Sequence, residues 1–82
     1  MSKYRWIIEK DHISGECNGV SGPQNYNPKI KEGKVKFELF DDDKILYYTG
    51  VLFGKYEGFE PLDDFGMPNA GCTLVKINGE WL

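Results

Sequence analysis

Apolar and polar residues alternate over residues 3–10, which predicts a first β-strand. Tyr4, Trp6 and Ile8 fall on one side of such a strand, and Arg5 lies on the more polar side. Because successive side chains of a strand point to opposite faces, this pattern is typical of a strand buried on one face.

The clearest pattern is a β-hairpin that begins near residue 34. Val35, Phe37 and Leu39 alternate with charged residues, and a second apolar run covers residues 45–53. The acidic residues 41–43 lie between the two, and Asp suits a turn because it bonds its own backbone. We therefore expect the two runs to pair antiparallel, with the first three side chains on one face.

The returning strand, residues 45–53, is apolar on both faces, so we expect it to be central and covered on both sides. Gly50 interrupts it and indicates a bulge or a bend. A last hairpin is predicted for residues 73–77 and 80–82, since Asn78-Gly79 is a favoured two-residue turn.

Two stretches, residues 12–28 and 54–72, are rich in Gly and Pro, Asn or Asp, and are predicted to be long irregular connections. A short strand near Val20 and one helical turn around residues 62–65 are the only regular structure expected in them. The fold class predicted is all-β: one domain over residues 1–82, a small curled antiparallel sheet or partly open barrel of about five strands.

Composition narrows the function classes. The chain has 82 residues and a formal net charge of −3, from 13 acidic and 10 basic residues, which argues against a general nucleic-acid binder. Neither an apolar run of about 18 residues nor a signal-peptide pattern is present. We therefore expect a cytoplasmic protein without membrane contact.

The residues able to bind metal or act as nucleophiles do not form a recognisable motif. Cys17 and Cys72 lie far apart without a C-x-x-C, and His12 is the only histidine. Their spacing requires neither a zinc site nor a Cys–His dyad. We expect two free, reduced, buried thiols, with no metal, no cofactor and no enzymatic activity.

Two further segments have a functional and a structural interpretation. Residues 66–73 match the spacing of a phosphate-binding loop, but Cys72 replaces its lysine, so a glycine-containing turn is the better interpretation. Asp41, Asp42 and Asp43, with Glu38, could ligate a hard cation. They do not follow the EF-hand pattern, which favours a solvated turn.

A basic stripe precedes and enters the first hairpin. It consists of Lys29, Lys31, Lys34 and Lys36. Lysines that alternate with core residues would share one solvent face, where Tyr26 or Tyr48 could stack on a base. Nucleic-acid binding through the Lys29–Lys36 face is therefore one alternative function.

An acidic and aromatic segment within residues 57–72 is the candidate partner-binding surface. Its members are Glu57, Phe59, Glu60, Asp63, Asp64, Phe65 and Met67. Apolar anchors surrounded by charges are typical of protein interfaces. The structural alternative is that Phe59, Leu62 and Phe65 close one end of the sheet.

Residues 59–73, together with residues 40–43 and 46–50, resemble small uncharacterised proteins of bacteria and their mobile elements. The resemblance implies an inhibitor of a host nucleic-acid-handling defence system, acting through its acidic surface. The leading hypothesis from the residues themselves is a non-enzymatic cytosolic module that binds a protein partner.

Overall fold

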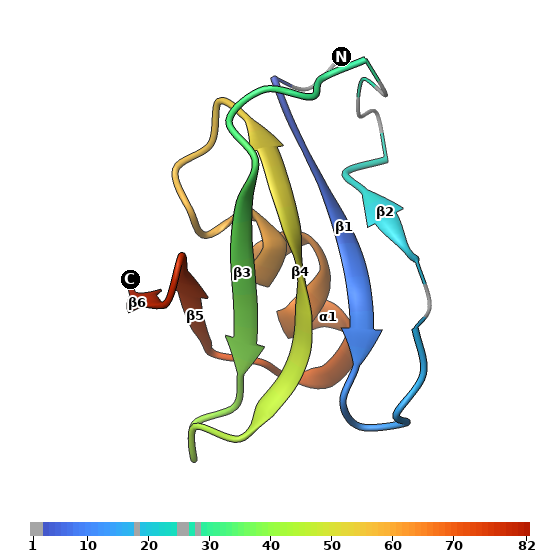
Figure 1. Cartoon of the computed structure of the whole chain (residues 1–82). Coiled ribbons are helices and arrows are strands. Elements are labelled where there is room, and N and C mark those ends of the chain that lie inside the picture. Colours follow the sequence, from blue (N-terminus) through green and yellow to red (C-terminus); the bar gives the residue numbers. More distant parts are fainter. Residues whose placement is uncertain (1–2, 18, 25–26, 28) are drawn as a thin grey trace.

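The computed structural model describes residues 3–17, 19–24, 27 and 29–82. In this part of the chain an antiparallel sheet of six strands has the order β2-β1-β4-β3-β5-β6 (Figure 1). The strands are β1 (Tyr4–Asp11), β2 (Ser21–Gly22), β3 (Val35–Phe40), β4 (Leu46–Gly54), β5 (Leu74–Ile77) and β6 (Glu80–Trp81). The sheet is open, because β2 and β6 at its two edges do not pair with each other. The predicted mainly β architecture is confirmed.

The register places the expected residues on one face. Phe37 pairs with Gly50 and Leu39 pairs with Tyr48 across β3 and β4. On the other side of β4, Trp6 pairs with Leu52. The antiparallel hairpin and the central position of β4 are therefore as predicted, and β2 lies close to the short strand expected near Val20.

Two irregularities curl the sheet. The register shifts between Ile8 and Lys10 in the β1–β4 pair, and again at the end of the β3–β4 pair. The bulge that was predicted at Gly50 of β4 therefore lies in β1, next to the residue that pairs with Gly50. Gly50 itself makes room for the Phe37 ring, since a β-carbon there would lie 2.6 Å from the Cζ atom of Phe37.

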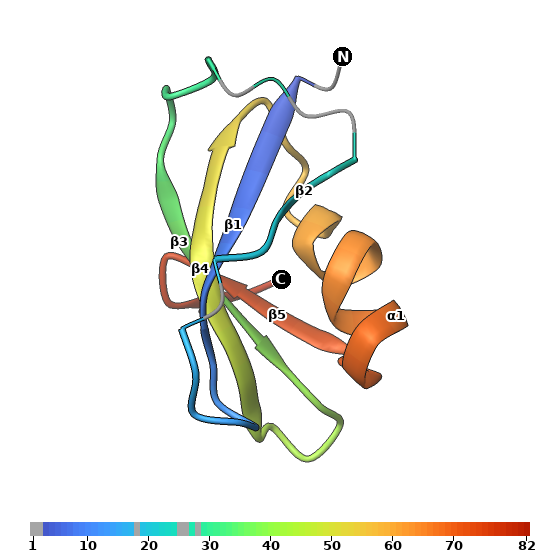
Figure 2. The same cartoon turned by 90° about the vertical axis from the view of Figure 1, so that its right-hand side faces the viewer.

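A helical segment covers one face of the sheet (Figure 2). It consists of the π-helix η1 (Leu62–Gly66) followed directly by α1 (Met67–Ala70). The one helical turn predicted around residues 62–65 is confirmed, but the irregular chain predicted after it is wrong, because the helical segment continues to Ala70. One proline and one glycine lie at its ends: Pro61 is the N-cap of η1, and Gly71 ends α1 in the left-handed conformation with φ 69°.

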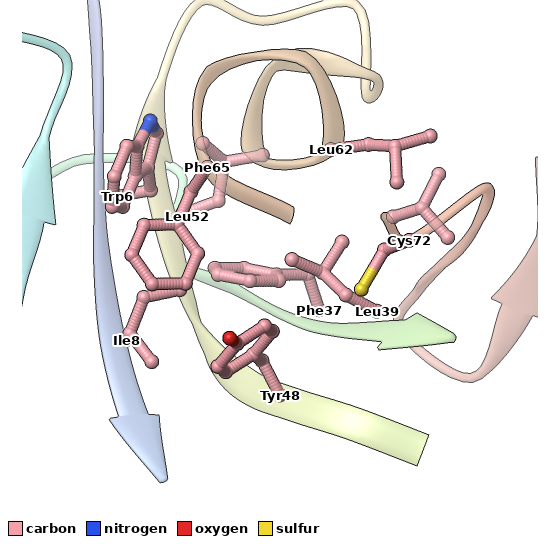
Figure 3. Packing of buried hydrophobic residues seen from close by; sticks show 10 residues of the cluster. Trp6, Ile8, Phe37, Leu39, Tyr48, Leu52, Leu62, Phe65 and Cys72 are labelled. Atoms are coloured by element: carbon pink, nitrogen blue, oxygen red, sulfur yellow. The ribbon is translucent and has the colours of Figure 1, made fainter. Parts of the chain in front are cut away.

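The hydrophobic core fills the space between this helical segment and the strands (Figure 3). Its buried members are Trp6, Ile8, Phe37, Leu39, Tyr48, Leu52, Leu62, Phe65, Cys72 and Val75. Phe65 packs edge-on against Trp6 and Tyr48, with ring centroids 5.5 and 4.8 Å apart. These aromatic contacts fix the helical segment on the sheet.

The opposite face of β4 is also covered. Val51 and Phe53 are buried there, and the Arg5 guanidinium lies 4.2 Å from the centroid of the Phe53 ring. The prediction that β4 is buried on both faces is therefore confirmed for this end of the strand, whereas Tyr47 and Thr49 are only partly buried. No helix among the described residues is long and apolar enough to cross a membrane.

Candidate functional site

The inner side of the helical segment belongs to the core. Leu62 is 5 % exposed and Phe65 is 9 % exposed, and both contribute to the core cluster. Phe65 therefore cannot be an exposed anchor for a partner. For these two residues the structure agrees with the alternative that they close the sheet, although they cover its face rather than its end.

Asp64 connects the helical segment to the first strand. Its Oδ2 atom accepts hydrogen bonds from the Tyr4 hydroxyl at 2.8 Å and from the Trp6 indole Nε1 at 3.1 Å. Burial, followed by the bond to Asp64, raises the pKa of Tyr4, so the phenol stays protonated and remains a donor. This carboxylate has a structural task.

Glu60 has a similar task at the start of the helical segment. Its two carboxylate oxygens accept hydrogen bonds from the backbone amides of Glu57, at 2.7 Å, and Gly58, at 2.6 Å. Gly58 has φ 118°, and a β-carbon there would lie 2.2 Å from a methyl carbon of Leu82. The carboxylate therefore stabilises a tight turn that only glycine fits.

The outer side carries the remaining candidates. Phe59 is 46 % exposed and Met67 is 50 % exposed, and Asp63 between them is exposed as well. These three residues are spaced by four, and the Asp63 amide bonds to the Phe59 carbonyl at 2.9 Å. Residues four apart in a helical segment share a face. We call Phe59, Asp63 and Met67 the outer stripe, which the exposed Glu57 precedes in the chain.

The seven predicted residues thus divide into three groups. Phe65 is in the core, Glu60 and Asp64 hold the segment to the rest of the fold, and the others face solvent. The sequence grouped these seven residues only by their positions in the chain. It missed the division because the partners of Asp64 lie about 60 residues earlier in the chain.

No protein family model, curated protein or solved structure matches the chain.

The basic stripe does not form one continuous face. Lys29 and Lys31 lie in the loop before β3, near Lys3 and Lys55, which the sequence did not single out. Lys36 is exposed on β3, facing away from the helical segment because it alternates with Phe37. The stacking residues do not support a base platform beside the stripe: Tyr48 is buried in the core, and Tyr26 is outside the described residues.

Only one of the two cysteines is buried as predicted. Cys72 is buried, and burial, followed by the charge of Asp41, raises the pKa of its thiol to about 11. Cys17 is exposed, so the expectation of two buried thiols is wrong. Cys17 directly follows Glu16, which bridges to the end of β1, and therefore lies in the connection outside the core.

We predict that a thiol reagent at pH 8 modifies one cysteine of the folded protein. Cys17 should react because it is accessible. Cys72 should stay unmodified until the protein unfolds, because it is buried and its thiolate is scarce at that pH. Mass spectrometry of the labelled, digested protein checks this, with Cys17→Ser as the control that should take up no label. Rapid native labelling of Cys72 would contradict the assignment.

The remaining polar candidates have local roles. Asp41 accepts hydrogen bonds from the amide of Ile45 and from that of Asp43, both at 2.9 Å, and these bonds, the first above all, lower the pKa of its carboxyl. Asp42 bonds to the Thr73 hydroxyl, and His12 bonds to Thr49 through Nε2 at 3.2 Å. Within the described residues, no group of three or more His, Cys, Asp or Glu side chains could hold a metal ion.

The segment with phosphate-loop spacing is part of a helix followed by a strand. Gly66 has helical φ and ψ, and only Gly71 needs the left-handed conformation. A β-carbon at Gly66 would lie 2.9 Å from a methyl carbon of Leu39, so this glycine allows the helical segment to approach the sheet. Helix-to-sheet packing explains these glycines.

Proposed function

We propose that this domain is a cytoplasmic, non-enzymatic protein-binding module that recognises a basic partner through the outer stripe and Glu57. The observation that carries the proposal is the pair of half-exposed apolar side chains, Phe59 and Met67, on either side of Asp63. Large apolar side chains at the centre of an interface supply most of its binding energy, and charges at the rim select the partner.

The stripe is held on a rigid support, which favours binding. The inner side of the same segment is fixed by Phe65 in the core and by the bonds of Asp64 to β1. A preorganised surface loses less conformational entropy when it binds. Exposed carboxylates beside the stripe attract a positively charged partner and speed its association.

The resemblance to proteins of mobile elements suggests a more specific form of this function. In that form the basic partner is a host protein that normally binds nucleic acid, and the carboxylates take the place of phosphates. The same surface serves both forms, so the identity of the captured protein separates them.

Capture from a lysate of the source cells, with and without nuclease, tests the proposal. We expect a captured protein that nuclease does not release, and whose yield falls at least about tenfold for the double variant Glu57→Lys and Asp63→Lys. The matched control is Glu9→Lys with Glu16→Lys, which makes the same change in charge at exposed positions away from the stripe. Equal losses for the two variants, or release by nuclease, would contradict the proposal.

A further inference from the structure

Four lysines from three separate parts of the chain line a groove at one end of the sheet. Lys3 directly precedes β1, Lys55 directly follows β4, and Lys29 and Lys31 belong to the loop before β3. The groove has a volume of about 660 Å³. Figure 1 shows this loop crossing the end of the sheet where β1 begins and β4 ends. The only acidic residue that lines the groove, among those described, is Glu32.

Backbone contacts hold the lysine-bearing segments together. The Lys55 amide bonds to the Lys3 carbonyl at 2.9 Å, and the Gly54 amide bonds to the Glu32 carbonyl at 2.7 Å. The Arg5 side chain donates to the Ile30 carbonyl. These bonds fix the backbone on both sides of the groove, so the four lysines line one hollow.

Gly54 is needed for this arrangement. It has φ 88°, and a β-carbon there would lie 2.3 Å from the Lys3 carbonyl oxygen and 2.9 Å from a methyl carbon of Ile30. Only glycine allows the loop to lie this close to the strand ends. The concave shape of the groove is therefore built into the backbone.

We propose that this groove binds a compact anion that carries two or more phosphate groups. Like charges that converge on one concavity repel each other, and a multiply charged anion converts that repulsion into binding. Lysine is a common phosphate ligand because its ammonium acts as a mobile point charge with three donors. The proposal does not rest on the protein-binding function, whose surface adjoins the groove at Glu57.

The surroundings favour a compact anion over a long nucleic acid. Lys3 and Lys55 also line a second hollow, together with Tyr4, Tyr56, Glu57 and Glu60. A long phosphate backbone that left the groove on this side would meet those carboxylates. A short polyphosphate stays within reach of the four ammonium groups, and a nucleoside attached to it could contact Tyr56.

Two double variants separate the groove from the linear stripe of lysines. Lys3→Gln with Lys55→Gln removes two charges from the groove and none from the stripe. Lys34→Gln with Lys36→Gln removes two charges from the stripe, at exposed positions that do not line the groove. Titration calorimetry with inorganic tripolyphosphate at low salt is the measurement, and thermal melting confirms that each variant is folded.

We expect the first variant to weaken tripolyphosphate binding by about tenfold or more, because contacts between charged groups are lost. The second should weaken it less than about threefold, through long-range charge alone. Equal losses, a larger loss for Lys34 and Lys36, or no binding by the unchanged protein would overturn the proposal.

Two further probes define the ligand. A nucleoside triphosphate that binds more tightly than tripolyphosphate, with the gain removed by Tyr56→Ala, identifies a nucleotide; equal binding identifies the polyphosphate group alone. Affinity that instead rises with the length of a single-stranded oligonucleotide would overturn the compact-anion proposal in favour of nucleic acid.

Discussion

Replacing Phe37 by Ala is expected to lower the free energy of unfolding by about 3–5 kcal/mol. The side chain is 1 % exposed, and its ring lies over Gly50, where no side chain can move in to fill the space. The cavity would open in the central strand pair, directly below the helical segment. For a domain of this size, such a loss is a large part of the total stability.

Urea denaturation followed by tryptophan fluorescence measures this effect. Phe59→Ala is the matched control, because it removes the same side chain from a position that is 46 % exposed. We expect the control to lose less than about 1 kcal/mol. If the two substitutions cost the same, Phe37 is not the centre of the core. An unfolded Phe37→Ala beside a folded control supports the assignment.

The strands were predictable because each carries a pattern that depends only on near neighbours. The alternation of Val35, Phe37 and Leu39 determines which face is buried, and Asn78-Gly79 marks the last turn with φ 53° and 81°. Both patterns can be recognised in a single sequence. A short strand was also predicted near Val20, and the two-residue strand β2 lies next to that position.

The helical segment was harder to predict because its glycines and prolines resemble helix breakers. Gly66 lies within the segment, where the absence of a side chain allows close packing against Leu39 and Cys72. Pro68 lies in the first turn of α1, where a missing amide hydrogen costs little. The π-helical geometry of η1 also departs from the ordinary helical period. Tertiary contacts therefore decide the local structure here.

The candidate surfaces were predictable only in outline. Sequence places Glu60, Asp63 and Asp64 in one acidic run, but their roles depend on partners that are distant in sequence or on the local turn. Likewise, the lysines of the groove come together only because β1 and β4 pair, which places Lys3 beside Lys55. A pattern in one segment carries no information on such pairings.

The second large effect on stability is expected for the two carboxylates that hold the acidic segment to the rest of the fold, as opposed to those that face solvent. Changing Glu60 and Asp64 together to Lys removes four hydrogen bonds, two to backbone amides and two to the Tyr4 and Trp6 side chains. A hydrogen bond to a partly exposed carboxylate contributes less to the free energy of unfolding than the same bond would contribute if it were buried. We expect a total loss of about 3 kcal/mol. Changing Glu57 and Asp63 to Lys makes the same change in net charge without removing a side-chain hydrogen bond seen in the structure.

Thermal melting of these two double variants, in the same buffer at moderate salt, tests the division most directly and needs no binding partner. We expect Glu60→Lys with Asp64→Lys to lower the melting temperature by more than about 10 °C, and Glu57→Lys with Asp63→Lys to change it by only a few degrees. Equal melting temperatures for the two variants, or a larger loss for Glu57 and Asp63, would contradict it.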